Sequence, residues 1–201
     1  LDPGTTGHGL FKLYARSIAS SFLFLVGVSL VLAHWPDFRG KGYWQRLAMV
    51  AGAAALISAA TWFAMPEEFI FFGILHEITV ASVLGLAFVR LPALLTLAIA
   101  VAVVMLPQFF RAEFFDAPWL WWVGLSAHVP RSNDYVPLFP WFGAVLAGIA
   151  LTRLAIATGL RERLARIRFA NTRSVWLLMF AGRHSLAFYL VHQPVLIAMV
   201  W

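Results

Sequence analysis

The chain has 201 residues, of which 62% are apolar and only 12% are charged, and its mean hydropathy is +0.82. This balance excludes an ordinary soluble domain and any disordered or fibrous class. The absence of cysteine excludes disulfides, thiolate metal sites and a cysteine nucleophile. The formal charge of +6 is carried mainly by arginines in loops between apolar runs, which indicates membrane topology and no nucleic-acid partner.

Long apolar stretches predict an all-α fold, a polytopic transmembrane helix bundle in a lipid bilayer. About 20 apolar residues are needed for each helical crossing of the hydrocarbon core. We expect residues 1–201 to form one membrane-embedded domain with six spans, at 17–34, 44–64, 69–90, 92–106, 137–158 and 175–201. Alanine and glycine recur within these spans, as in residues 51–55 and 144–148, which favours close packing of helix backbones in lipid.

The charges of the loops predict the orientation of the bundle. Basic residues dominate the loops after the first, third and fifth spans, and acidic residues prevail after the second and fourth. Because basic loops stay on the cytoplasmic side, we expect 35–43 and 159–174 in the cytoplasm and 107–136 outside, in a bacterial cytoplasmic membrane. On this count Leu1 lies outside, so we expect one further span before it.

The pair His76 and Glu77 stands within the third expected span, about two turns from its outer end. An ionisable group in the hydrocarbon costs at least about 2.5–3.5 kcal/mol, so its presence requires a reason. Two readings remain open. The pair either makes a helix–helix hydrogen bond that fixes packing, or handles protons beside a wet cavity.

The last expected span carries a polar stripe. On an ideal helix Ser185, Tyr189 and His192 fall within about 60° of one another, so this face meets protein or water. His192 is a candidate for proton transfer, and a histidine satisfied within the core is the alternative. Tyr189 is suited to orient His192 or to contact a carbonyl, and Tyr189 and Ser185 are candidates for binding the substrate. At the start of this helix Gly182, Arg183 and His184 are candidates for binding an anionic phosphate, although such arginines also serve as topology signals.

A turn at Asn133 and Asp134 precedes the fifth span, at the expected outer mouth of the bundle. Asp134 is suited to orient an imidazole or to bind a sugar hydroxyl or amine, and helix capping is the alternative. The histidines show no metal-ligand spacing, so we expect no metal.

Four blocks, at residues 15–30, 72–77, 132–141 and 182–194, resemble a known membrane family. They are similar to bacterial proteins grouped with the catalytic domain of heparan-α-glucosaminide N-acetyltransferase. The resemblance implies transfer of an acetyl group from cytosolic acetyl-CoA to an extracytoplasmic sugar-like or glycan acceptor, with a histidine central to catalysis. His8 occupies a place similar to that of the family's catalytic histidine.

Other functions remain open at this point. One alternative is a non-catalytic accessory subunit of a larger membrane assembly, because the many aromatic residues are available for lateral packing. The partner is then another protein of that assembly or a second copy of the chain in a homo-oligomer. A proton-coupled transporter that uses His76, Glu77 and His192 is a third alternative, without the inverted repeat typical of that class.

Overall fold

The computed structural model describes residues 9–38, 40–160, 163, 176–177 and 180. The chain separates into two compact units, 1–157 and 158–201. Within the second unit, the Trp176 and Phe180 rings stack with their centroids 5.6 Å apart.

The described elements are all helical, which confirms the predicted helical membrane bundle. They are α1 (Gly9–His34), α2 (Gly40–Ala64), η2 (Pro66–Glu68), α3 (Ile74–Val89), α4 (Ala93–Phe109), η3 (Glu113–Asp116), η4 (Pro118–Val123) and α5 (Leu138–Ala157). Three helices are long and apolar enough to cross a membrane, at Arg16–His34, Gly40–Ala64 and Leu138–Ala157. α3 and α4 are shorter apolar helices of 16 and 17 residues. Each of the first five expected spans thus coincides with a helix, and the sixth lies outside the described residues.

The start of α3 differs from the prediction. We expected a span from residue 69, but residues 69–73 are not helical, and Gly73 is the extended residue that precedes the helix (φ −96°, ψ −172°). His76 and Glu77 therefore lie in the first turn, so the predicted depth of two turns was wrong. The cause is hydrogen bonding that composition does not reveal: in residues 69–73, backbone groups bind partners outside α3. The N–H of Ile70 donates to Thr61 Oγ1 at 3.0 Å, and the carbonyl of Phe72 accepts from the N–H of Val136 at 3.1 Å.

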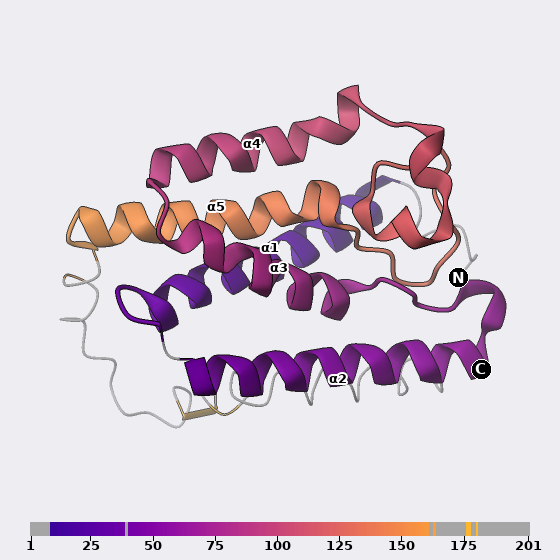
Figure 1. The fold of residues 1–201 in the computed structure, drawn as a ribbon, viewed down its shortest axis with the longest axis horizontal. Coiled ribbons are helices and arrows are strands. Elements are labelled where there is room, and N and C mark those ends of the chain that lie inside the picture. The colour runs from indigo at the N-terminus through magenta and orange to yellow at the C-terminus, as the bar shows by residue number, and fades with distance from the viewer. Residues whose placement is uncertain (1–8, 39, 161–162, 164–175, 178–179, 181–201) are drawn as a thin grey trace. The chain divides into compact units, whose positions relative to one another are not determined.

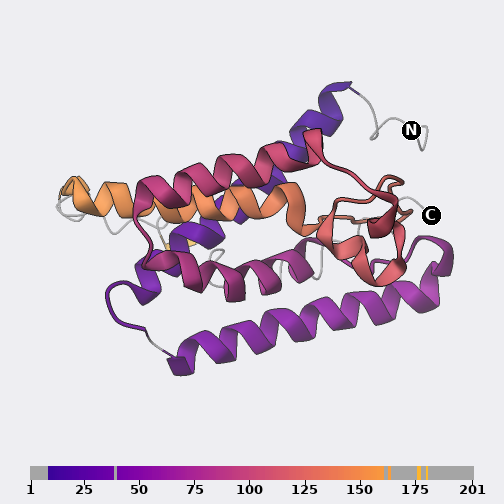
Figure 2. The same cartoon turned by 45° about the horizontal axis from the view of Figure 1, so that its top comes forward.

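α5 is the central helix of the unit. Figure 1 shows it between α4 and α3, with α2 beyond α3, and Figure 2 shows α1 crossing behind α4 and α5. The core between α1 and α5 contains side chains with no exposed surface, namely Leu23, Val31, Val145, Leu146 and Ile149. Apolar burial and close packing hold these helices together.

Glycines set the closest approach between α1 and α5. A Cβ at Gly148 would overlap the carbonyl oxygen of Phe24, and a Cβ at Gly27 would overlap that of Val145. Gly52 on α2, by contrast, has no atom of a described residue within 4 Å of such a Cβ. The prediction that small residues let backbones approach is thus confirmed at Gly148, and in the other predicted run Ala53 and Ala54 are buried whereas Gly52 meets no described residue.

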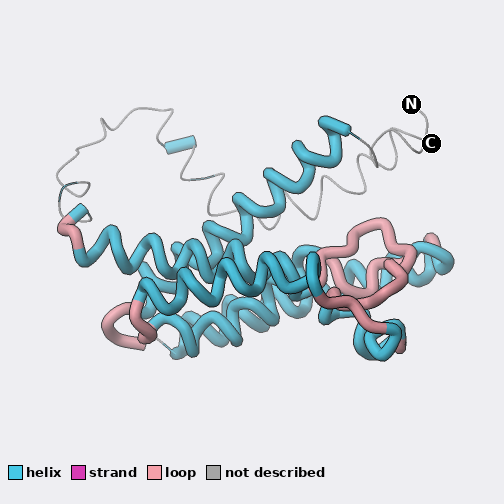
Figure 3. The backbone as a smooth tube through the Cα atoms, turned by 90° about the horizontal axis from the view of Figure 1, so that it is seen from above, coloured by secondary structure: helices cyan, strands magenta, loops and turns pink. Residues whose placement is uncertain are grey.

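The connections between helices gather at two opposite ends, as Figure 3 shows. The α1–α2 and α3–α4 connections lie at the same end as the last residue of α5, and the α2–α3 and α4–α5 connections lie at the other. The connections that share an end are the expected ones. Which end faces the cytoplasm stays a prediction, and below we use inner end and outer end only as names for the first and second of these two ends.

Arg153 of α5 joins three helices at the inner end. Its Nη1 donates to the carbonyls of Val89 and Leu91, the second at 3.3 Å, and its guanidinium carbon lies 3.7 Å from the centre of the Trp35 ring. A cation at this place satisfies carbonyls at the C-terminus of α3 and favours the helix dipole. The cation–π contact adds attraction to Trp35.

Candidate functional site at the outer end of α3

Two side chains satisfy the free backbone N–H groups at the start of α3. The N–H of Gly73 donates to Nδ1 of His76 at 3.2 Å, and the N–H of Ile74 donates to Oδ2 of Asp134 at 2.9 Å. The first N–H groups of a helix have no partner within the helix, so such side chains stabilise its start. Four residues from two distant segments meet here.

The ring of His76 has a hydrogen bond at each nitrogen. Because Nδ1 accepts from Gly73, the neutral ring carries its proton on Nε2, which lies 3.1 Å from Oγ of Ser58 on α2. The hydroxyl of Ser58 in turn donates to the carbonyl of Ile70 at 2.6 Å. The chain of bonds ties α2 to the start of α3, so in this arrangement His76 makes the packing contact that was one of the two predicted readings.

Asp134 is placed by a loop that runs along the segment before α3. In this loop the N–H of Asn133 donates to the carbonyl of Glu68 at 3.1 Å, and Oγ of Ser132 donates to the carbonyl of Phe69 at 3.1 Å. Burial raises the pKa of the Asp134 carboxyl, and the hydrogen bond from Ile74 opposes that rise. The expected capping role of Asp134 is present, but it serves α3 and not α5.

Gly73 is required for this contact. A Cβ at Gly73 would overlap the carboxylate of Asp134 and Cγ2 of Ile70. Only a residue without a side chain lets the carboxylate reach the helix start. The side chain of Asn133 is exposed, and its Nδ2 lies 3.5 Å from the sulfur of Met65. It therefore stands at the rim of the site.

Glu77 is the buried polar group of the site. Its side chain has no exposed surface, and neither carboxyl oxygen has a hydrogen-bond partner among the described residues. It shares one face of α3 with Ala81, Gly85 and Val89, which are also buried, and this face packs toward α1 and α5. A buried polar group without a partner is costly and calls for a role.

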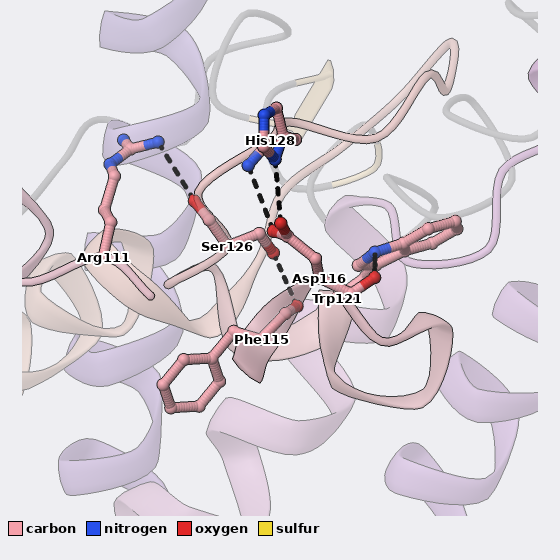
Figure 4. A network of polar contacts seen from close by, with 6 residues as sticks. All are labelled: Arg111, Phe115, Asp116, Trp121, Ser126 and His128. Carbon is pink, nitrogen blue, oxygen red and sulfur yellow. Dashed lines mark hydrogen bonds and ion pairs between the residues drawn. The ribbon is translucent and has the colours of Figure 1, made fainter. Parts of the chain in front are cut away.

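The α4–α5 connection holds a second polar cluster, drawn in Figure 4. Asp116 accepts from the backbone N–H of His128 at 3.1 Å and contacts Nδ1 of His128 at 2.8 Å. The pKa of Asp116 is lowered by the hydrogen bond from the His128 side chain, and the same bond raises the pKa of His128. Nearby, Arg111 donates to the carbonyl of Ser126 at 3.5 Å and Ser126 to that of Phe115 at 3.0 Å.

A family model described as the catalytic domain of heparan-alpha-glucosaminide N-acetyltransferase matches residues 1–194. The chain belongs to this family. No curated protein and no solved structure matches it. The match runs over nearly the whole chain and includes all residues of the site at the start of α3.

The structure brings together two of the groups predicted for this family member. His76, with Glu77 next to it in the chain, and Asp134, with Asn133, meet at the start of α3. The predicted catalytic residues His8 and His192, the acceptor residues Ser185 and Tyr189 and the phosphate-binding residues Gly182, Arg183 and His184 lie outside the described residues. Within the described part of the chain no group of three His, Cys, Asp or Glu side chains is placed to hold a metal ion.

Sequence reasoning missed several polar residues in this heparan-alpha-glucosaminide N-acetyltransferase family member. Ser58 stands in a run of alanines and other small residues, with no local sign that its hydroxyl meets His76. Arg153 was predictable from the sequence as a residue with a polar partner, because a cation within an apolar span requires one. The pairing of Asp116 with His128 joins two loop residues that sequence patterns do not connect.

Proposed function

We propose that the chain is an integral membrane acetyltransferase that moves an acetyl group from cytosolic acetyl-CoA to an extracytoplasmic sugar-like acceptor. The observation that carries the proposal is membership of the catalytic-domain family across residues 1–194. The polar site at the outer end of α3 supports it, since buried ionisable groups inside a membrane bundle are expensive and are generally functional.

The reaction requires a base and a place for each substrate. The acceptor nitrogen or oxygen attacks the thioester carbonyl carbon while a base takes the acceptor proton. The carbon–sulfur bond then breaks, and the base returns the proton to the departing sulfur, so CoA leaves as the thiol. We assign the base to His192 and a second proton-transfer pair to His76 and Glu77. His8 is the alternative base implied by the family resemblance.

The acceptor is held in this proposal by Asn133 and Asp134 together with Tyr189 and Ser185. The exposed amide of Asn133 suits a sugar hydroxyl, and the carboxyl of Asp134 suits a hydroxyl or an amine. Gly182, Arg183 and His184 bind the phosphates of acetyl-CoA, because guanidinium groups and helix N-termini favour phosphate.

Acetyl transfer by the full-length protein in detergent tests the proposal, with labelled acetyl-CoA as donor and glucosamine as acceptor. We expect His192→Ala and His76→Ala, checked for folding by thermal unfolding, to reduce turnover by about 100-fold or more. His128→Ala serves as the matched control, since it removes an exposed imidazole outside the proposed machinery, and turnover stays unchanged. Full activity of both site variants overturns the residue assignment.

Acetyl-CoA binding, measured by calorimetry, separates the enzyme from the alternative accessory subunit. Binding that weakens in Arg183→Gln supports the proposal. No binding by the full-length protein, together with stoichiometric partners on purification, overturns it in favour of the accessory subunit.

A further inference from the structure

The four most exposed large apolar side chains among the described residues lie at the outer end. They are Phe63, Phe109, Trp119 and Phe114, with exposed fractions of 85, 82, 75 and 74%. Phe63 and Phe109 belong to the last turns of α2 and α4, whereas Phe114 belongs to η3 and Trp119 to η4 in the α4–α5 connection. Exposed apolar side chains that gather on one part of a protein indicate an interaction surface.

α4 has one face toward α5 and an opposite face without a protein neighbour among the described residues. Thr96, Ala100 and Val103 are buried and recur at helical spacing on the side that packs on α5. Val101 and Met105 are exposed on the other side, and the whole helix carries no charged residue. In a membrane bundle such an exposed face without charge meets lipid.

α4 alone is too short to cover the hydrocarbon core. At 1.5 Å per residue its 17 residues span about 25 Å, whereas the hydrocarbon core is about 30 Å thick. The exposed Arg90, shortly before the helix begins, limits the apolar surface at the inner end. Apolar residues beyond Phe109 are therefore suited to make up the difference at the outer end.

Aromatic rings continue the surface of α4 into the connection. The ring of Phe110, directly after α4, lies 6.2 Å from that of Phe115, which in turn lies 5.4 Å from that of Phe114. Figure 4 shows the ring of Phe115 pointing away from the pair of Asp116 and His128. The connection thus has an aromatic side that is continuous with α4 and a charged side that carries this pair.

We propose that residues 110–123 form an interfacial segment that lies in the lipid headgroup layer at the outer end, with the rings of Phe114 and Trp119 at the boundary with the acyl chains. Aromatic side chains favour this layer of the bilayer. Asp116 and His128 then face water. A lipid surface is the partner that fits, because the exposed rings extend the lipid-facing side of α4 and do not form a separate patch.

The interfacial segment is joined to the candidate site. The hydroxyl of Tyr135 donates to the carbonyl of Trp121 in η4 at 2.7 Å, and the ring of Phe71 lies 5.3 Å from that of Trp121 and 5.6 Å from that of Tyr135. Tyr135 follows Asp134, the residue that caps α3. In this proposal the interfacial segment therefore sets the depth of the candidate site in the bilayer.

Single cysteines test this placement in the full-length protein, because cysteine does not occur in the chain. Phe114→Cys and Trp119→Cys are labelled with an environment-sensitive fluorophore, and the protein is reconstituted in phosphatidylcholine vesicles. Val101→Cys, on the exposed face of α4, provides the hydrocarbon reference. His128→Cys is the matched control, since His128 is exposed on the charged side of the same connection. All four replaced side chains are exposed, and thermal unfolding checks that each variant folds.

We expect the labels that replace Phe114 and Trp119 to emit at shorter wavelength than the label that replaces His128. They should lose most of their emission to lipids with a nitroxide near the top of the acyl chain, whereas aqueous iodide should quench the control. Iodide quenching of all three labels to the same extent would place the rings in water and overturn the proposal.

Protection of the Phe114 and Trp119 labels from both quenchers would show that protein covers these rings, either a second copy of the chain or another subunit. That result would also overturn the proposal. None of these readouts involves acetyl transfer, so failure of this inference is distinct from failure of the proposed function.

Discussion

Oδ2 of Asp134 accepts a hydrogen bond of 2.9 Å from the backbone N–H of Ile74, a residue 60 positions earlier in the chain. The bond joins the loop before α5 to the start of α3. Through this bond a loop residue caps the helix that carries His76 and Glu77. The geometry of the candidate site therefore depends on a contact between two segments that are remote in sequence.

Replacing Asp134 tests this tertiary cap. We expect Asp134→Ala to lower the free energy of unfolding by about 0.5–2 kcal/mol, as at other helix caps, and Asp134→Asn to retain most of the stability because its amide oxygen still accepts. Thermal unfolding in detergent measures both changes. Asn133→Ala is the control, and equal effects of the two alanine variants would contradict the capping role.

The carboxyl of Asp134 also gives stability a pH dependence. Because burial raises its pKa in the folded protein, the neutral form is favoured there. The stability that the protonated carboxyl contributes is fully present below its pKa in the unfolded chain, about 3.9, and is lost as the pH rises through its pKa in the folded protein. From pH 4 to pH 7 the melting temperature of the wild type should therefore fall relative to that of Asp134→Asn. A difference that stays constant over that range would rule this out.

The His76–Ser58 bond is expected to couple α2 to α3. His76→Ala leaves the N–H of Gly73 without its partner, at a cost of about 1–3 kcal/mol, and Ser58→Ala removes the contact to α2. Unfolding of both single variants and the double variant gives the coupling energy, which we expect to be about 0.5 kcal/mol or more. Thr79→Ala is the control, since among the described residues the Thr79 hydroxyl bonds only to the carbonyl of Leu75 in its own helix. Strict additivity of the two changes would contradict the bond.

Glu77→Gln separates a functional carboxyl from a structural one. The glutamine amide has nearly the same shape as the carboxyl, but it is neutral and has no titratable proton. We therefore expect the variant to fold and to be at least as stable as the wild type. If Glu77 transfers protons, acetyl transfer falls by about 100-fold or more. Glu113→Gln, a change in the α4–α5 connection, is the control. A stable Glu77→Gln variant with normal turnover would remove Glu77 from the site.

The glycine contact between α1 and α5 predicts that alanine destabilises the protein at one glycine and not at another. Gly148→Ala places a Cβ against the carbonyl of Phe24, and overpacking of this kind costs about 1–3 kcal/mol. Gly52→Ala meets no atom of the described residues within 4 Å, and alanine favours the helix, so the free energy of unfolding should stay equal or rise. Melting temperatures of the two variants provide the comparison, and equal losses would refute the contact.

Apolar runs predict the helices well because the bilayer imposes their length and composition. α1, α2, α4 and α5 coincide with expected spans, and the charges of their loops predict which connections share an end. The start of α3 was misplaced because the apolar residues 69–73 bind other segments through their backbone. Composition reports whether a residue enters lipid or protein, but not whether its N–H groups have helical partners.

The candidate site was predictable as a set of residue types and not as a set of contacts. Ionisable residues in apolar surroundings directed attention to His76, Glu77 and Asp134. Helix periodicity assigns a residue to a face, but it does not say which helix that face meets. Ser58 at His76 and Arg153 at Val89 are contacts of that second kind, and only the fold reveals them.

Glu77 also bears on how the protein enters the membrane during its synthesis. An acidic side chain costs about 2.5–3.5 kcal/mol at the centre of an inserting helix, Glu77 in the first turn of α3 costs part of this, and α3 has only 16 residues to offset it. α4, which follows after a short connection, has 17 residues and no charge. Insertion into the bilayer is therefore most favourable when α3 and α4 leave the translocon together as a hairpin. The leucines and valines of α4 then offset the cost of the carboxyl in α3.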